Sequence, residues 1–119
     1  MAVAIIELEN DFELGRHAEV QLEELGVNSE RFTVDQLIDL PGEVARRLED
    51  FEAVIALGDM TGSEYVSEAV SELIRTDSKT DKPVAKVLDE KKVRDRHTYQ
   101  EELKNLASER AEKLAQQLD

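Results

Sequence analysis

Apolar residues recur along the chain in two alternating patterns. Four short runs are almost continuously apolar, which is typical of buried parallel strands. The expected strands are AVAIIEL (2–8), RFTVDQLI (31–38), EAVIALG (52–58) and PVAKVL (83–88). The second run is the least apolar, so we expect its strand at an edge of the sheet.

Stripes of apolar residues three and four positions apart predict a helix after each strand. The expected helices cover about 12–25, 41–51, 66–74 and 98–118, with a polar connection at 76–82. Gly26 follows the first helix as a C-terminal cap, and Pro41 suits the first turn of the second. Thr98 and Glu101 have the spacing of a capping box at the start of the last helix.

This alternation predicts a single α/β domain over residues 1–119, with helices on both faces of a four-stranded parallel sheet. We expect the strand order 2-1-3-4 in this three-layer α/β/α sandwich. Ligands of such sheets bind beyond the carboxyl ends of the strands, where the strand order reverses. The first and third strands are neighbours in this order, so the loops 9–12 and 59–63 are predicted to form a ligand crevice.

Composition excludes several kinds of chemistry. The 119 residues include no cysteine, which rules out disulfides, thiol catalysis and zinc–thiolate sites. The two histidines, His17 and His97, are far apart in the sequence, so we expect no metal site. His17 lies beside Ala18 on the first expected helix, and we expect it at the surface or at an interface. No catalytic acid can be singled out among 28 carboxylates.

The net charge of −13 makes nucleic acids and anionic membranes unfavourable partners. It fits either a well-solvated acidic surface or adaptation to a salt-rich cytoplasm. No segment approaches the ~20 apolar residues of a membrane span. The amino-terminal run has the pattern of a first strand rather than a signal peptide, so we expect a cytoplasmic protein.

The loop after the third expected strand is the first candidate site. Thr61, Gly62 and Ser63 precede a helix, where free N–H groups and the helix dipole favour an anion. Asp59 would repel that anion. A structural alternative is a capping box formed by Thr61 and Glu64, which needs no ligand.

Two further segments carry candidate binding residues. Phe12, in the first loop, either stacks on a planar ligand or packs over the end of the sheet. Arg94 and His97 belong to a basic segment, 91–97, that suits phosphate or the anionic edge of a substrate, including a substrate held by a neighbouring subunit. The alternative is a charge-balanced loop that pairs with nearby carboxylates, namely Asp89, Glu90 and Asp95.

Several segments together resemble archaeal-type riboflavin synthases and the wider lumazine synthase family. They are TVDQLIDLP (33–41), ARRL (45–48), EAVIALG (52–58), EYVSEAVSELI (64–74) and VLDEKKVRDRHTYQEELKNLASERAEKLAQQL (87–118). The resemblance is spread over nearly the whole chain, and none of the motifs is diagnostic by itself.

The resemblance implies a lumazine synthase-like sandwich that assembles into a ring of five or a larger shell, with active sites between adjacent subunits. It implies a small-molecule substrate, either a ribityllumazine that is dismutated to riboflavin or the ribityl-aminopyrimidine from which lumazine is made. Neither reaction needs a bound redox cofactor, so the resemblance implies no cofactor. The substrate-binding positions that it implies are Phe12, Arg94, His97 and the 59–63 loop, namely Asp59, Thr61, Gly62 and Ser63.

The 59–63 loop is shorter than in the family and has no His, Lys or Arg, and Asp35-Gln36 stands where riboflavin synthases have Pro-Gly. Two functions therefore remain open: a riboflavin-pathway enzyme, and a non-catalytic assembly or ligand-binding protein on the same scaffold. A receiver-like signalling domain is a third and less favoured function. Such a domain needs an acidic cluster, a central Asp and a Lys, which are matched only loosely here, by Glu9, Asp11, Asp59 and Lys91.

Overall fold

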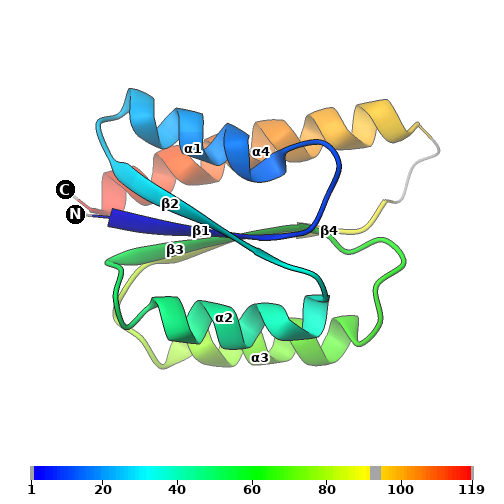
Figure 1. The fold of residues 1–119 in the computed structure, drawn as a ribbon, viewed down its shortest axis with the longest axis horizontal. Helices are drawn as coiled ribbons and strands as arrows, with labels where there is room; N and C mark the ends of the chain where they lie inside the picture. Colours follow the sequence, from blue (N-terminus) through cyan, green and yellow to red (C-terminus); the bar gives the residue numbers. More distant parts are fainter. Residues whose placement is uncertain (1, 92–94, 119) are drawn as a thin grey trace.

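The computed structural model describes residues 2–91 and 95–118, in which strands and helices alternate as the sequence predicts (Figure 1). The elements are β1 (Ala2–Leu8), α1 (Leu14–Glu24), β2 (Asn28–Val34), the short 3₁₀ helix η1 (Leu37–Asp39), α2 (Leu40–Arg47), β3 (Ala53–Asp59), α3 (Val66–Ser78), β4 (Val84–Asp89) and α4 (Arg96–Gln117). Arg94, one of the predicted site residues, lies outside the described residues.

The four strands form one parallel sheet with the order β2-β1-β3-β4, which confirms the predicted topology. β1 and β3 occupy the centre and are buried along almost their whole length. β2 lies at an edge, as its lower apolar content predicts, and β4 forms the other edge.

The helices complete three layers, with α1 and α4 on one face of the sheet and α2 and α3 on the other (Figure 1). Alternate side chains of the central strands enter the two cores. In β1, Val3 and Ile5 pack beneath α1 and α4, whereas Ala4 and Ile6 pack against α2 and α3. Burial on both faces explains why this strand is continuously apolar instead of alternating.

The prediction for the second strand is wrong, because the strand begins three residues and ends four residues earlier than expected. β2 covers Asn28–Val34, whereas the apolar pattern predicted 31–38. The register explains the shift, because β2 pairs with β1 from Ala2↔Asn28 to Leu8↔Val34, where β1 ends. Beyond Val34 the chain turns into η1, and Leu37 is buried in the α2/α3 core rather than in the sheet.

The last helix begins at Arg96, so the predicted capping box of Thr98 and Glu101 is wrong. Asp95 is the N-cap, and its carboxylate accepts the backbone N–H of His97 at 3.0 Å and the hydroxyl of Thr98 at 2.5 Å. These hydrogen bonds, the one from the Thr98 hydroxyl first, lower the pKa of Asp95 below its ordinary value. Aspartate is as good an N-cap as threonine, and it comes first here.

Three other helix predictions need correction. α1 begins at Leu14 rather than near Phe12, and α2 ends at Arg47 rather than near Phe51. α3 continues to Ser78 through part of the predicted polar connection. Two apolar residues of the predicted stripes also lie outside the core: Leu25 is 45% exposed and Ile74 is 55% exposed.

Candidate functional site

The loops that follow the four strands meet at the carboxyl edge of the sheet. Those after β1 and β4 lead to the α1/α4 layer, and those after β2 and β3 lead to the α2/α3 layer (Figure 1). The strand order therefore reverses between β1 and β3, where the sequence predicts a crevice between residues 9–12 and 59–63.

The first turn of α4 contacts both of these loops. Tyr99 is buried, and its hydroxyl lies 2.8 Å from Asp59 Oδ1 and 3.0 Å from the carbonyl oxygen of Asp89. Arg96 donates to both carboxylate oxygens of Asp11, at 3.0 and 2.8 Å, on the surface. The predicted crevice is thus bridged by the chain's own last helix.

Hydrogen bonds within the 59–63 loop leave little of it available for an anion. The N–H of Thr61 donates to Asp59 Oδ1 at 3.0 Å, and the N–H of Ser63 donates to the carbonyl oxygen of Met60 at 2.9 Å. The hydroxyl of Thr61 accepts the N–H of Lys91 at 2.6 Å. Two of the three backbone N–H groups that were predicted to bind an anion, those of residues 61–63, are therefore already hydrogen-bonded within the protein.

The predicted capping box of Thr61 and Glu64 is also wrong. α3 begins only at Val66, and Tyr65 is its N-cap residue with a left-handed backbone (φ 60°). Thr61 lies too far from the first helical turn to accept its N–H groups, because an N-cap side chain reaches only the second or third helical residue.

Burial raises the pKa of Tyr99 well above its ordinary value of 10, and the hydrogen bond to Asp59 raises it further. We predict that the stability that Tyr99 contributes is complete below pH 10 and declines as the pH rises further. The reason is that the unfolded chain releases the phenolic proton there and the folded chain retains it. Urea denaturation between about pH 8 and pH 11 measures this decline. The Tyr99→Phe variant should lose less stability over that range. If the free energy of unfolding falls equally with pH in the two proteins, the raised pKa of Tyr99 is wrong.

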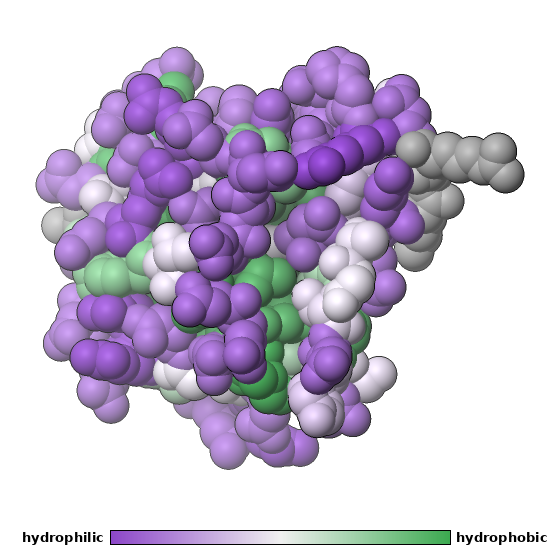
Figure 2. Space-filling view, turned by 45° about the vertical axis from the view of Figure 1, so that its right-hand side comes forward, coloured by the Kyte–Doolittle hydropathy of each residue, from purple (hydrophilic) through white to green (hydrophobic). Residues whose placement is uncertain are grey.

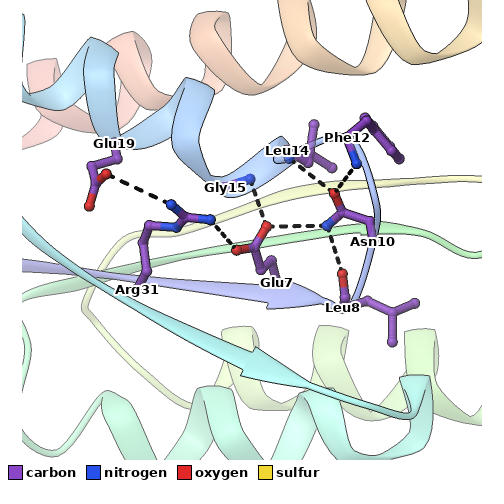
Figure 3. Close-up of polar contacts among 8 residues, drawn as sticks. All are labelled: Glu7, Leu8, Asn10, Phe12, Leu14, Gly15, Glu19 and Arg31. Carbon is purple, nitrogen blue, oxygen red and sulfur yellow. Dashed lines mark hydrogen bonds and ion pairs between the residues drawn. The ribbon is translucent and has the colours of Figure 1, made fainter. Parts of the chain in front are cut away.

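A buried carboxylate, Glu7, lies at the end of β1 and is 4% exposed (Figure 3). It accepts three hydrogen bonds: from the N–H of Gly15 at 2.7 Å, from Arg31 at 2.7 Å and from the side-chain amide of Asn10 at 3.2 Å. Arg31 reaches it from the neighbouring strand β2, and the hydrogen bond to Glu7 is the main reason why the pKa of this guanidinium is raised.

Glu7 and Asn10 together cap the first turn of α1. The local N-cap residue, Glu13, makes no capping hydrogen bond through its side chain. Instead, Asn10 Oδ1 accepts the N–H groups of Phe12 and Leu14 at 3.3 and 3.1 Å, and Glu7 accepts that of Gly15 (Figure 3). Anions are stabilised at a helix N-terminus, so this network accounts for the burial of a charged side chain.

An open groove lies on the opposite side of the carboxyl edge, between the loops after β2 and β3. Its volume is about 410 Å³, and it is lined by residues 35–38 and 62–65. Ile38 is 40% exposed and Tyr65 is 60% exposed, so apolar and aromatic groups face solvent there. Figure 2 shows apolar atoms that reach the surface between hydrophilic side chains in the lower half of this view.

The structure brings only some of the predicted site residues together. Gly62 and Ser63 line the groove, while Asp59 and Thr61 bond to Tyr99 and Lys91. Phe12 is half-buried against the α1/α4 core, as its packing alternative predicts. His97 is exposed, and its backbone N–H donates to the carboxylate of Asp95. Within the described residues, the candidate positions do not converge on one pocket.

Sequence reasoning missed the Glu7 network and the groove wall at 35–38. A signal for the first was present, because Glu7 is the one charged residue in the run AVAIIEL and a buried charge requires a partner. Its partner Arg31 lies on another strand, so only the register reveals it. The error in the second strand concealed the turn at 35–38.

The described residues place limits on other kinds of site. Among residues 2–91 and 95–118, no three His, Asp or Glu side chains are arranged to hold a metal ion. None of the helices in that part of the chain is long and apolar enough to cross a membrane.

Comparisons with known proteins identify the fold alone. The sequence matches no protein-family model and no curated protein. Among solved structures, a chain described as a split gene transketolase in an inactive β4 tetramer superposes with a TM-score of 0.66 at 16% identity, over 97% of this chain and 38% of the other. This chain therefore spans less than half of that protein.

A de novo designed Rossmann 2x2 fold protein superposes with a TM-score of 0.48 at 18% identity, over 94% of this chain and 89% of the design. At these identities the likeness to solved structures concerns architecture only. The chain is a three-layer α/β/α sandwich with a four-stranded, all-parallel sheet in the order 2-1-3-4.

Proposed function

We propose that this chain is a non-catalytic ligand-binding protein and that the groove between residues 35–38 and 62–65 is its binding site. The observation that carries the proposal is the groove itself, which flanks the end of the central strand β1. Its volume of about 410 Å³ lies in the range of small-molecule sites. Ligands of open parallel sheets bind beyond the carboxyl ends of the strands.

The lining favours a planar ring with a hydroxylated side chain. Tyr65 and Ile38 provide an aromatic face and an apolar contact, on which a heterocycle can stack. Gln36 and Ser63 offer hydrogen bonds to hydroxyl groups. Asp35 and Glu64 disfavour a strongly anionic ligand, and the resemblance to riboflavin synthases supplies a ribityllumazine as the ligand to test.

We propose that the protein does not convert its ligand, because the groove contains few side chains that can act as general acids or bases. None of its eight lining residues is His, Lys or Arg. Two carboxylates elsewhere at the carboxyl edge are engaged, Asp59 with Tyr99 and Glu7 with Arg31. General acid–base catalysis requires a side chain placed within hydrogen-bond reach of the reacting atom.

A riboflavin-pathway enzyme is the second candidate, and the sequence resemblance favours it. In that case a neighbouring subunit, in the ring of five that the resemblance implies, would bring its 91–97 segment to the site. Asp35 and Glu64 would be the remaining acid–base groups in the groove.

A fluorescence titration with 6,7-dimethyl-8-ribityllumazine tests both candidates. We expect saturable binding without riboflavin formation, and a dissociation constant about tenfold higher for Tyr65→Ala, because stacking contributes about 1–3 kcal/mol. Tyr65→Phe should bind almost as the unmodified chain does, since it keeps the ring. Leu25→Ala removes another exposed apolar side chain, at the C-cap of α1 and outside the groove, and serves as the control.

The outcomes separate the two candidates. Binding together with riboflavin production would overturn the non-catalytic proposal in favour of the enzyme. If the lumazine neither binds nor reacts at low and high salt, both candidates are rejected for this ligand class.

A further inference from the structure

The outer edge of β4 is an unpaired strand edge. Among the described strands, β4 has β3 as its one neighbour. The carbonyl oxygens of Pro83 and Asp89 accept hydrogen bonds from β3 and the residue after it, at 3.1 and 2.8 Å. Successive residues of a strand direct their backbone groups to opposite sides. Val84, Lys86 and Leu88 therefore direct their N–H and C=O groups away from the sheet.

Apolar side chains flank this edge on both layers. Leu106 of α4 is half-buried and lines a hollow of about 360 Å³ beside the end of β4. On the other layer, Asp77 of α3 forms an ion pair with Lys86 of β4 at 2.5 Å. Ile74 precedes Asp77 by three residues and so lies on the same side of α3, where it is 55% exposed.

Charges of opposite sign occupy the two ends of the seam between β4 and α4. At the start of β4, a hollow of about 290 Å³ is lined by Arg110 and Lys113. At the end of β4, the second hollow is lined by acidic side chains, namely Asp89, Glu102 and Glu109. No ion pair found within residues 2–91 and 95–118 includes Arg110 or Lys113, although the chain carries a net charge of −13.

We propose that the seam of β4 and α4 is a homodimer interface, in which the β4 strands of two copies pair antiparallel. A twofold axis across β4 brings the basic end of each copy against the acidic end of the other, so one patch complements itself. The pairing satisfies the outward backbone groups of both strands and joins the two sheets into one. It also covers Ile74 and Leu106.

This arrangement differs from the ring of five implied by the sequence resemblance, and it does not depend on the ligand groove. The two assemblies differ in mass. A dimer has twice the chain mass of 13.5 kDa, whereas a ring has five times that mass.

Analytical ultracentrifugation at about 0.15 M salt, where charges beyond about 8 Å are screened, measures the assembly. We expect a dimer for the unmodified chain. Lys113→Glu and Glu102→Lys should each raise the dimer dissociation constant about tenfold or more, because each places like charges at both ends of the seam. Mixing the two variants should restore dimers, since opposite charges then face each other at both ends. Arg46→Glu, on α2, makes the same charge change away from the seam and should leave the dimer intact.

A backbone variant tests the strand pairing itself. Lys86→Pro deletes an N–H group that points away from β3, which edge strands tolerate, and it should produce monomers. Thr33→Pro deletes the equivalent outward group of β2 and should not change the mass. A monomer or a ring for the unmodified chain would overturn the proposal, as would charge variants that remain dimeric.

Discussion

Replacing Arg31 by Met is expected to lower the free energy of unfolding by about 3 kcal/mol, because Glu7 then remains buried without its cationic partner. Arg31 donates to Glu7 at 2.7 Å, and the side chain of Glu7 is 6% exposed. Methionine retains most of the apolar stem and so isolates the loss of the charge. Urea denaturation at pH 7 gives the difference directly.

A double variant controls for packing. Glu7→Leu combined with Arg31→Met removes both charges, and it should be more stable than Arg31→Met alone, because no unpaired charge remains buried. If the free energy of unfolding of Arg31→Met lies within about 0.5 kcal/mol of that of the unmodified chain, the ion pair does not stabilise this edge of the sheet. Glu7 would then become a candidate for a functional carboxylate.

Gly15→Ala is expected to destabilise the protein by about 2 kcal/mol, although glycine-to-alanine changes inside helices usually stabilise. A Cβ atom at this position would lie 2.6 Å from the carboxyl carbon of Glu7. The carboxylate would have to move and would lose its hydrogen bond from the first turn of α1. Thermal or urea denaturation provides the measurement.

Gly42 is the matched control, because it lies in α2 and a Cβ atom there would meet nothing within 4 Å. Gly42→Ala should therefore stabilise the protein by about 0.5–1 kcal/mol. The two variants make the same chemical change, but they should change the free energy of unfolding in opposite directions. If both variants stabilise the protein, Glu7 does not approach α1 as closely as described.

The order of the strands was predictable because each central strand is a continuous apolar run. β1 matches its run residue for residue, and β3 is displaced by one. β2 was misplaced because edge strands bury little, so its polar start at Asn28–Glu30 gave no apolar signal. That strand is defined by pairing with β1, and pairing is not visible in a local pattern.

The topology directed attention to the carboxyl edge of the sheet, where Gly62 and Ser63 line a groove. The predicted partner of that loop was the segment 9–12, whereas the other wall of the groove is formed by residues 35–38. The contacts of Asp59 with Tyr99 and of Glu7 with Arg31 join residues 40 and 24 positions apart. Spacing rules describe neighbours on one helix or strand, and they cannot foresee partners at such separations.

The central claim is that the groove between residues 35–38 and 62–65 binds the ligand, while the charged groups at this edge hold the fold. A titration of the ¹⁵N-labelled protein with 6,7-dimethyl-8-ribityllumazine, followed by amide chemical shifts, tests it most directly. The account predicts saturable shifts at Gln36, Ile38, Ser63 and Tyr65, with unchanged signals for residues 9–12 and His97. Shifts centred on residues 9–12 and His97, or no shifts at all, would contradict it.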